Sequence, residues 1–519
     1  MYSLLTQLAA GVLVLAFSAS ALPASDGSSL TTNVTNCLNS YQVPFEDSTS
    51  SNWTSLITPY NLRLFWYPAI VTLPYTPQHV SASVICAAAA GLKVQAKSGG
   101  HSYASYSSGG QNGSLIVDLQ NFNGVSVNNA TGIATVGGGV RLGNLALDIY
   151  AQGQRALPHG TCPGVGIGGH FTHGGYGHSS RLWGLGLDTI VALDVVLANG
   201  SYIHVTPTQY PSIYFAMRGA ADSFGIAVNF YLQTHPAPWS VINFSASIPQ
   251  VLDNATIVTE ALLGLQTTVA DPSYINGNIS FGIYTDSSGA FSLSGWCIEC
   301  DVSTFNSITF PKLLESFPPP SSQSATPLGW IDSLTNLANG EALNVPLYGY
   351  DMHDTFYAKS IVTKEAAPPT HAEWLGFWTF VTGPGRSAPN PWYSIINLYG
   401  GAGSQINVPP ANASAYSDRD ALWVFQNYAS HASPFPTSTV VPFLDNLTSS
   451  LAAGNNATDF GIYLNYADPD LSARQVARLG YGTSTYERLL AIKRRVDPRD
   501  VFWNPQAVGN VGLAEVMDG

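Results

Sequence analysis

Two glycine-rich stretches, residues 97–110 and 158–177, constrain this chain more than any other feature of its sequence. Glycine has no side chain to block a ligand, and successive backbone N–H groups in such turns can converge on an anion. Each stretch also carries one nucleophilic side chain, His101 in the first and Cys162 in the second. We therefore expect the two stretches to form loops that hold one large cofactor between them.

The second stretch contains Gly164, Gly166 and Gly169 at the spacing of a dinucleotide-binding fingerprint. That fingerprint needs a buried strand before it and an apolar helix after it. Here a proline-containing turn precedes the glycines, and further glycines and histidines follow, so we expect the whole stretch to stay a loop. The histidines are not spaced for one face of a helix and no carboxylate accompanies them, so we expect no metal site.

Composition bears on the partners of the chain. Only 10% of its 519 residues are charged, and the formal net charge is −13. A typical soluble protein has about 25% charged residues. The acidic balance argues against nucleic acid or an anionic membrane as a partner, because both repel a negative surface. We expect a small-molecule ligand and a monomeric protein.

The N-terminus has the features of a secretory signal peptide over residues 1–21. Residues 4–17 are mostly apolar, and Ala19-Ser20-Ala21 offers a small-x-small cleavage site. A membrane anchor is the alternative, but the apolar run is short and interrupted for a bilayer span. Eleven Asn-x-Ser/Thr sequons predict a secreted glycoprotein. They lie at Asn33, Asn52, Asn112, Asn129, Asn199, Asn243, Asn254, Asn278, Asn412, Asn446 and Asn456.

The chain has five cysteines, so one thiol is left over in an oxidising compartment. Cys162, inside a glycine-rich loop, is our candidate for the unpaired one. Cys37 and Cys86 would then tie an N-terminal arm to the first domain. Cys297 and Cys300 form a Cys-x-x-Cys pair, for which a local structural disulfide is favoured over a redox-active pair. A zinc site would need a second ligand pair, and none is suitably spaced.

Hydrophobic patterning divides the rest of the chain into an arm (22–60), a mixed helix and strand region (61–239), a region of apolar strands (240–458) and a closing segment (459–519). The fold class predicted from this order is α+β with an antiparallel sheet in the second region. The predicted helices span 81–90, 142–152 and 486–495. The predicted strands span 92–97, 114–119, 132–137, 189–198, 202–205, 279–284, 291–296, 392–401, 422–428 and 461–468.

The closing segment carries a tyrosine motif. Tyr463, Asn465, Tyr466 and Asp468 lie in the last predicted strand, where Tyr466 and Asp468 would share one face and the other two residues the opposite face. A free tyrosine has a pKa of about 10, so it needs help from its surroundings to accept a proton near neutrality.

These motifs together resemble one family. Residues 97–102 and 158–170 look like the two flavin loops of the berberine bridge enzyme-like flavoproteins, and residues 463–468 and 497–506 look like the closing segment of the same family. The family belongs to the vanillyl-alcohol oxidase and p-cresol methylhydroxylase (PCMH) superfamily. The signal peptide, and Tyr103 two residues after His101, resemble its fungal glucooligosaccharide and chitooligosaccharide oxidases.

The resemblance implies a PCMH-type FAD-binding domain over residues 61–239 and a substrate domain over 240–458, with an antiparallel sheet covered by helices. The segment 459–519 would complete the FAD domain and the active site. FAD would be bound covalently twice, through His101 to the 8α-methyl group and through Cys162 to C6. A hydrogen-bonded loop histidine and an inert buried thiol are the alternatives for these two residues.

The resemblance also implies roles for the neighbours of these two residues. Backbone N–H groups of the first loop would bind the pyrophosphate, glycines of the second would allow close approach, and two apolar residues would flank the flavin or adenine. The residues of the first loop are Ser98, Gly99 and Gly100, with Ser102. The glycines of the second loop are Gly164, Gly166 and Gly169, and the two apolar residues are Ile226 and Val228.

By resemblance, Tyr466 is the catalytic base, with Asp468 beside it; a core aromatic is the alternative. In the oligosaccharide oxidases an aspartate on a neighbouring strand hydrogen-bonds this tyrosine, and our alignment places Asn397 there. An amide can orient a phenol but cannot take up its proton. The same alignment puts Ile395 where those oxidases carry a polar sugar-binding residue, so either the alignment slips or the substrate differs. The residues expected to contact a sugar are Tyr103, Tyr393 and Gln426.

Three hypotheses follow. The first is a secreted FAD oxidase that oxidises the reducing-end C1 hydroxyl of an oligosaccharide to a lactone and reduces O2 to H2O2. The second is an FAD oxidase of a secondary metabolite, an alkaloid or a phenolic alcohol, which the apolar Ile395 favours. The third is a secreted glycoprotein that keeps the fold without catalysis, which would be colourless.

Overall fold

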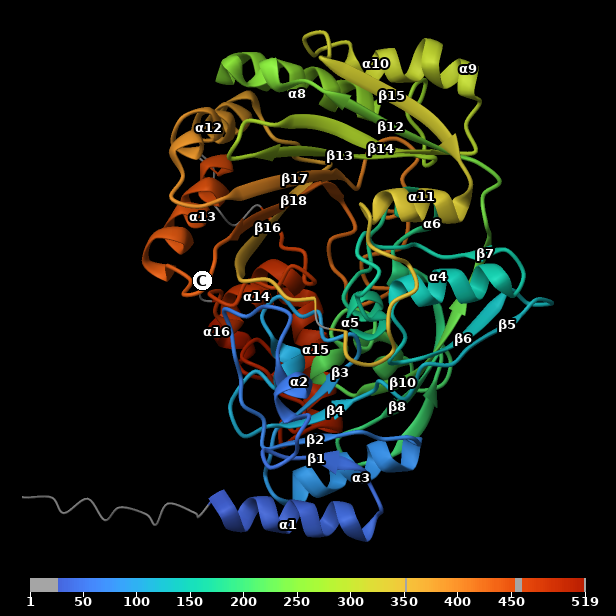
Figure 1. Ribbon diagram of the computed structural model, residues 1–519, viewed down its shortest axis with the longest axis vertical. Helices are drawn as coiled ribbons and strands as arrows, with labels where there is room; N and C mark the ends of the chain where they lie inside the picture. Colours follow the sequence, from blue (N-terminus) through green and yellow to red (C-terminus); the bar gives the residue numbers. More distant parts are fainter. Residues whose placement is uncertain (1–26, 351, 453–459, 518–519) are drawn as a thin grey trace, which may run out of the picture.

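The computed structural model of the protein describes residues 27–350, 352–452 and 460–517. The predicted signal peptide and the sequon at Asn456 lie outside these ranges. Figure 1 shows an upper half built on one broad sheet and a lower half of smaller sheets and helices, in which the red C-terminal helices join the blue and cyan N-terminal part. The predicted α+β fold class is confirmed.

The first sheet of the lower half has the strand order β1-β2-β4-β3, and its last three strands are parallel. Its elements are α1 (Gly27–Ser40), β1 (Phe45–Glu46), α2 (Trp53–Ile57), β2 (Ile70–Thr72), α3 (Pro77–Ala89), β3 (Val94–Lys97) and β4 (Leu115–Asp118). Helix α3 begins after Thr76, whose hydroxyl accepts a hydrogen bond from the His79 N–H. Its buried face packs on the sheet through Val80 and Val84. Strand β3 therefore runs directly into the first glycine-rich stretch from a fixed position.

The second sheet of the lower half is antiparallel, in the order β5-β6-β10-β8-β9. The predicted turn at Asn199-Gly200 joins β8 to β9, and Gly200 has the positive φ of +79° that such a turn requires. The elements of this part are β5 (Val125–Asn128), β6 (Ile133–Gly137), α4 (Leu142–Ala151), β7 (Arg155–Ala156), α5 (Ile167–Thr172), α6 (Ser180–Trp183), β8 (Ile190–Val196), β9 (Tyr202–Val205), α7 (Pro211–Ala216), β10 (Ile226–Gln233) and β11 (His235–Pro236).

The upper half is an antiparallel sheet of seven strands in the order β15-β12-β14-β13-β17-β18-β16. Helices α8, α12 and α13 cover its outer face, as Figure 1 shows, and bury the tryptophans Trp374 and Trp378 against it. The elements are β12 (Val241–Ser247), α8 (Ala255–Ala270), β13 (Ile279–Asp286), β14 (Phe291–Ile298), α9 (Val302–Thr304), α10 (Phe310–Leu314), β15 (Ser322–Leu328), α11 (Trp330–Leu337), β16 (Phe356–Lys364), α12 (His371–Thr382), β17 (Trp392–Leu398), β18 (Ala421–Ser430) and α13 (Thr437–Leu451).

The C-terminal segment returns to the lower half. It contains α14 (Ala473–Val476), α15 (Gly482–Val496) and α16 (Leu513–Met517). After α15 the chain runs beside β3, where the Val94 N–H donates a hydrogen bond of 2.8 Å to the Val501 carbonyl. The buried Lys493 forms an ion pair of 2.7 Å with Asp497 and donates to the Phe502 carbonyl. These contacts fix the end of the chain to the sheet that carries the first glycine-rich stretch.

Two local predictions are wrong. Residues 461–468 are not a strand: only Gly461 forms a bridge, with Val362, and the following residues turn back on themselves. The second glycine-rich stretch does not stay a loop throughout, because Ile167–Thr172 forms the short helix α5. Burial explains that helix, since Ile167 and Phe171, one helical turn apart, both enter the core.

The cysteine predictions are confirmed within the described residues. Cys37 is bonded to Cys86 and joins α1 to α3, Cys297 is bonded to Cys300, and Cys162 is a free thiol. The N-terminal arm is therefore a helix tied to the first sheet. Among the described helices, none has the length and apolar character needed to cross a membrane.

Candidate active site

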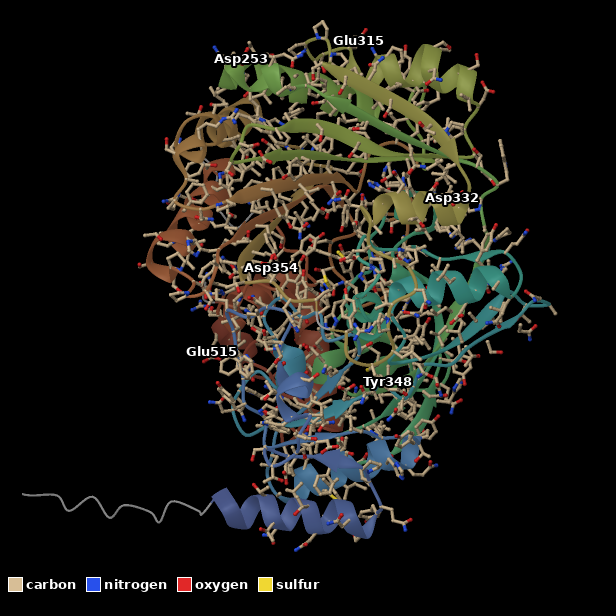
Figure 2. The ribbon with its side chains drawn as sticks, in the orientation of Figure 1. Asp253, Glu315, Asp332, Tyr348, Asp354 and Glu515 are labelled. Carbon is tan, nitrogen blue, oxygen red and sulfur yellow. A yellow bond between two sulfur atoms is a disulfide. The ribbon has the colours of Figure 1, made fainter. Side chains whose placement is uncertain are left out.

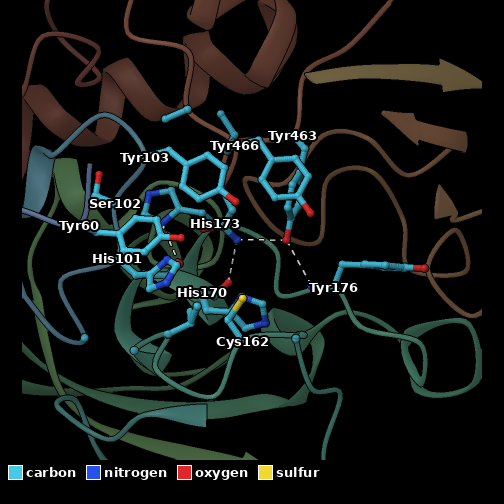
Figure 3. A pocket seen from close by; sticks show the side chains of 18 of the residues that line it. Tyr60, His101, Ser102, Tyr103, Cys162, His170, His173, Tyr176, Tyr463 and Tyr466 are labelled. Carbon is cyan, nitrogen blue, oxygen red and sulfur yellow. Dashed lines mark hydrogen bonds between the residues drawn. The ribbon is translucent and has the colours of Figure 1, made fainter. Parts of the chain in front are cut away.

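A cavity of about 990 Å³ lies between the sheet of the upper half and the loops of the lower half. Both glycine-rich stretches line it, together with the start of β10, the inner face of the upper sheet and the turn at residues 463–467. Figure 3 shows Tyr103 and Tyr466 on one side of this space and Cys162 and His170 on the other. In Figure 2, Asp354 lies in the same region, where the two halves meet.

The two glycine-rich loops touch each other at glycines. A side chain at Gly99 would overlap the backbone of Gly166, and the reverse is also true, so only glycine fits at this crossing. The Arg141 guanidinium holds the loops together, because it donates to the Gly99 carbonyl at 2.8 Å and to the Gly164 carbonyl at 2.6 Å. Ser98 adds a further link, with its hydroxyl donating to the Gly138 carbonyl and accepting from the Gly168 N–H.

His101 stands at the cavity wall as a neutral imidazole. Burial, aided by the charge of Arg141, lowers its pKa to about 3. The Tyr60 ring lies flat against it, with ring centroids 3.5 Å apart and planes inclined by 23°. A neutral imidazole held in this way keeps a free lone pair and can act as a nucleophile without first losing a proton.

Cys162 lines the same cavity from the second loop. Burial and the negative charge of Glu341 raise the pKa of its thiol to about 11. The thiolate, which is the reactive form, is therefore a minor species at neutral pH. His101 and Cys162 thus line the same cavity, but only Cys162 must lose a proton before it can act as a nucleophile.

Several polar groups of the cavity have no hydrogen-bond partner within the described part of the chain. The backbone N–H groups of Gly99, Gly100 and His101 donate no hydrogen bond to another described residue. The Nε2 atom of His170 and the hydroxyl of Tyr106 are buried and likewise lack a partner among the described residues. Buried polar groups are normally satisfied, so this set predicts a polar ligand along the first loop.

Tyr466 projects from the turn after Gly461. The Tyr466 N–H donates to the Tyr463 carbonyl at 2.9 Å, and its ring stacks on Tyr103 with centroids 5.6 Å apart. Tyr463 supports the turn, since its hydroxyl accepts hydrogen bonds from the backbone N–H groups of Gly175 and Tyr176. Figure 3 shows Tyr463 and Tyr176 next to each other. Burial, followed by the nearby Tyr463, raises the pKa of Tyr466 well above its usual value. The phenol is therefore protonated in the absence of ligand.

The inner face of the upper sheet supplies the remaining wall. Gln426 on β18 donates from Nε2 to the Tyr103 hydroxyl at 2.8 Å. Ile395 on β17 lies directly opposite Gln426 in the antiparallel pairing of the two strands. Tyr393 lines the cavity and stacks on Tyr428, with ring centroids 4.8 Å apart. Asn397 also lines the cavity and is 8% exposed. Asn397, Tyr393 and Gln426 thus line one cavity, and their roles in catalysis and sugar binding stay predictions.

Three predicted site residues lie elsewhere. Asp468 does not share a face with Tyr466, because the turn directs its carboxylate away from the cavity to Lys359 and Tyr357. Val228 is packed in the core of the first sheet, whereas Ile226 reaches the cavity. Gly164 supports the crossing of the loops without lining the cavity. The strand error at residues 461–468 is the reason for the first of these corrections.

The remaining predicted residues of the two loops do line the cavity. They are Ser98, Gly99, Gly100, His101, Ser102, Tyr103, Cys162, Gly166 and Gly169. Sequence reasoning missed Tyr60, Asp354 and Tyr428, which lie far apart in the chain and carry no motif. It considered His170 only as a possible metal ligand and rejected that role. A histidine inside a predicted cofactor loop could instead have indicated a contact with the cofactor. No group of His, Cys, Asp and Glu in the described ranges is arranged to hold a metal ion.

The chain is similar in sequence to known proteins over most of its length. The chain matches family models described as "FAD binding domain", over residues 68–206, and "Berberine and berberine like", over residues 462–509. It is 34% identical to a xylooligosaccharide oxidase from Thermothelomyces thermophilus, over 91% of this chain and 93% of the relative.

The chain also resembles solved structures. A xylooligosaccharide oxidase from Myceliophthora thermophila in complex with xylobiose has a TM-score of 0.87 and 33% identity, and the match covers 92% of this chain and 100% of the other. A glucooligosaccharide oxidase from Acremonium strictum with 6-S-cysteinyl, 8α-N1-histidyl FAD has a TM-score of 0.86 and 30% identity, with coverage of 92% and 100%.

Proposed function

The chain belongs to the berberine bridge enzyme-like FAD flavoproteins, and within this family we propose that it oxidises the reducing end of an oligosaccharide. The C1 hydroxyl becomes a lactone, which water opens to an aldonic acid, and dioxygen takes up the two electrons and two protons as hydrogen peroxide. The observation that carries this proposal is the meeting of His101, Cys162 and Tyr466 at one cavity, from three separate segments.

The residues of the cavity fit FAD. The N–H groups of Gly99, Gly100 and His101 have no partner among the residues that the structure describes, and they suit a pyrophosphate, which glycine-rich turns bind through backbone donors. The unsatisfied Nε2 atom of His170 and hydroxyl of Tyr106 offer further polar contacts. A volume of about 990 Å³ is at the upper end of the range for ligand pockets.

Two covalent links to FAD are part of the proposal. His101 would bond to the 8α-methyl group and Cys162 to C6, the pair of attachments named for the Acremonium strictum relative. Each link would replace one flavin C–H bond, and the two electrons and two protons released would pass to dioxygen, as in turnover. The neutral imidazole of His101 is ready to bond, whereas Cys162 must first lose its proton. Tyr60 keeps the imidazole plane fixed by stacking against it.

In this reaction the protein has two tasks: to position the sugar and to accept the proton of its C1 hydroxyl. FAD supplies the hydride acceptor when it is bound. Loss of hydride from C1 would make the C1 hydroxyl strongly acidic, and Tyr466 would accept its proton while releasing its own phenolic proton to solvent. Tyr103 holds the Tyr466 ring by stacking, and Gln426 orients Tyr103. Tyr393 offers an aromatic surface for a sugar ring.

Replacing Asn397 by aspartate is expected to raise kcat about tenfold at neutral pH. A carboxylate can take up the proton that the Asn397 amide cannot, and a positioned base contributes about 10²- to 10⁴-fold to proton transfer. Burial of the new charge offsets part of that gain. Steady-state peroxide release measures the effect, with Asn397→Ala as the comparison. A kcat in N397D at or below that of N397A would contradict the placement of residue 397 beside the base.

A panel of sugars tests the proposed function directly. The purified holoprotein is incubated with xylo-, cello- and chito-oligosaccharides, and peroxide is measured together with the aldonic acid product. We expect equal amounts of peroxide and acid from at least one series. No peroxide across the panel overturns the proposal.

The apolar Ile395 in the cavity wall supports a second candidate, an oxidase of a secondary metabolite such as a phenolic alcohol or an alkaloid. Ile395 stands across from Gln426 where a sugar would need a polar partner. Peroxide from a phenolic alcohol such as vanillyl alcohol, with none from the sugars, favours this candidate.

The proposal also includes secretion, and the sequons then give a site-specific prediction. Asn243 should remain without a glycan, because it is 8% exposed and its Nδ2 donates to the Val241 carbonyl and, at 2.9 Å, to the Ser333 hydroxyl. Asn199, exposed at the turn between β8 and β9, should carry one. Peptide mapping of the secreted protein after enzymatic deglycosylation measures both. A substantial glycan fraction at Asn243 would be the opposite result.

A further inference from the structure

The turn that carries Tyr466 has no helix or strand of its own, so contacts with other elements must set its position. Strand β16 makes these contacts at the start of the turn. Gly461 and Val362 exchange two backbone hydrogen bonds of 2.9 Å, and the Tyr463 N–H donates to the Ser360 hydroxyl at 3.0 Å.

The same strand also fixes the far end of the turn. The Asp468 carboxylate lies 2.7 Å from the Lys359 ammonium and accepts a hydrogen bond of 3.0 Å from the Tyr357 hydroxyl. The side chains of Lys359 and Asp468 are only 16% and 4% exposed. The Asp470 N–H caps the same carboxylate at 3.0 Å, which closes the turn beyond Tyr466.

Lys359 has a second partner of a different kind. Asp445 on α13 lies 2.8 Å from its ammonium, but the Asp445 side chain is 46% exposed. Burial disfavours a charged Lys359, yet the two carboxylates outweigh it and raise its pKa, with Asp468 the stronger. An exposed ion pair contributes little, whereas a buried charge that loses its partner is strongly destabilised. The Lys359–Asp468 pair therefore constrains the turn, and the Lys359–Asp445 pair does so only weakly.

We propose that Lys359 is a positioning residue for the reaction: by pairing with the buried Asp468 carboxylate it holds the turn that aims Tyr466 at the substrate hydroxyl. The inference rests on the proposed role of Tyr466 as proton acceptor. Asp468, expected from sequence to act in the cavity, works from behind the turn instead. Tyr466 is only two residues away, with its ring against Tyr103 on one side and Tyr463 on the other, 5.6 and 4.9 Å between centroids.

A displaced Tyr466 costs rate rather than affinity, because the sugar is bound by other walls of the cavity. A misplacement of about 1 Å at a reacting group can cost about 10²-fold in rate. The effect expected from losing the ion pair is thus a fall in kcat with KM nearly unchanged. A residue that only stabilised the fold would lower the melting temperature without this split.

The test compares three variants of the holoenzyme with xylobiose as the substrate. We expect Lys359→Met to lower kcat by about 10- to 100-fold, with KM and covalent FAD content within twofold of wild type. Lys359→Arg keeps the ion pair and should restore at least a third of the wild-type kcat. Asp445→Asn, which removes only the exposed partner of the same lysine, should stay within twofold of wild type.

Hydrogen–deuterium exchange of the peptide over residues 461–470 provides a readout that needs no substrate. Exchange there should be faster in K359M and unchanged in D445N. Should K359M fail to accumulate, D468N takes its place with the same expected results. A kcat in K359M within twofold of wild type, or an equal loss in D445N, overturns the proposal. If wild type does not oxidise xylobiose, xylobiose is excluded as a substrate of the proposed function. The exchange experiment then decides by itself whether the Lys359–Asp468 pair holds the turn.

Discussion

Replacing Tyr466 by phenylalanine lowers kcat for sugar oxidation by about two to four orders of magnitude, the usual range for loss of a positioned proton-transfer group. The substitution removes only the hydroxyl, and the ring still stacks on Tyr103. KM should change little, since the phenol contacts the hydroxyl under reaction and not the rest of the sugar. Rapid-mixing measurement of flavin bleaching under anaerobic conditions isolates this step from reoxidation by oxygen.

Tyr103→Phe is the matched control for Tyr466→Phe. It also removes one phenolic hydroxyl from the same stack, together with the hydrogen bond from Gln426. We expect a rise in KM of about tenfold or less in Y103F, the size of one hydrogen bond, and a much smaller loss of kcat than in Y466F. Equal losses of kcat in the two variants would show that the stack, and not the Tyr466 proton, sets the rate.

The second large effect concerns attachment of the cofactor. In wild type, and in His101→Ala or Cys162→Ser alone, FAD should stay with the polypeptide after denaturation in acid or detergent. In the double variant it should be released completely, because neither nucleophile remains. Flavin fluorescence of the protein band on a denaturing gel measures this. Retention of flavin by the double variant would mean that another residue forms a bond.

The two single variants should differ in how attachment depends on pH. The pKa of His101 is lowered to about 3, so its imidazole is neutral over the whole working range and C162S should load FAD at a rate independent of pH. Burial raises the pKa of Cys162 to about 11, so in H101A the thiolate fraction rises tenfold with each pH unit below that value. The rate of covalent loading in H101A should therefore increase from pH 6 to pH 9. A flat profile in H101A would contradict the thiolate route.

Much of the site could be predicted from sequence because its chemistry is concentrated in contiguous segments. His101, Cys162 and Tyr103 lie in the two glycine-rich stretches, where residue type and spacing are visible directly. The free thiol followed from an odd cysteine count. Four of the seven strands of the upper sheet, β13, β14, β17 and β18, were predicted from runs of apolar residues, whereas β12, β15 and β16 were not. The antiparallel pairing of β17 with β18 then places Asn397 and Gln426 on neighbouring strands at the cavity wall.

What could not be predicted depends on contacts across the chain. Residues 461–468 have the alternating pattern of a strand, but β16 offers a single bridge at Gly461, and Ser360 and Lys359 then hold the following residues in a turn. An alternating pattern of apolar and polar residues does not reveal contacts with side chains from a distant part of the chain. Tyr60 is likewise invisible to motif reasoning, because its place against His101 is set by the pairing of residues 59–62 with residues 353–356.

Arg141 has a consequence for how the holoprotein forms. Its guanidinium already joins the carbonyls of both glycine-rich loops, so their mutual position comes from the protein alone. The entropy of ordering these loops is then lost during folding and not during cofactor uptake, which leaves more of the contact energy for affinity. FAD therefore binds to a site that is already formed. The slow steps after binding are then the formation of the two covalent bonds.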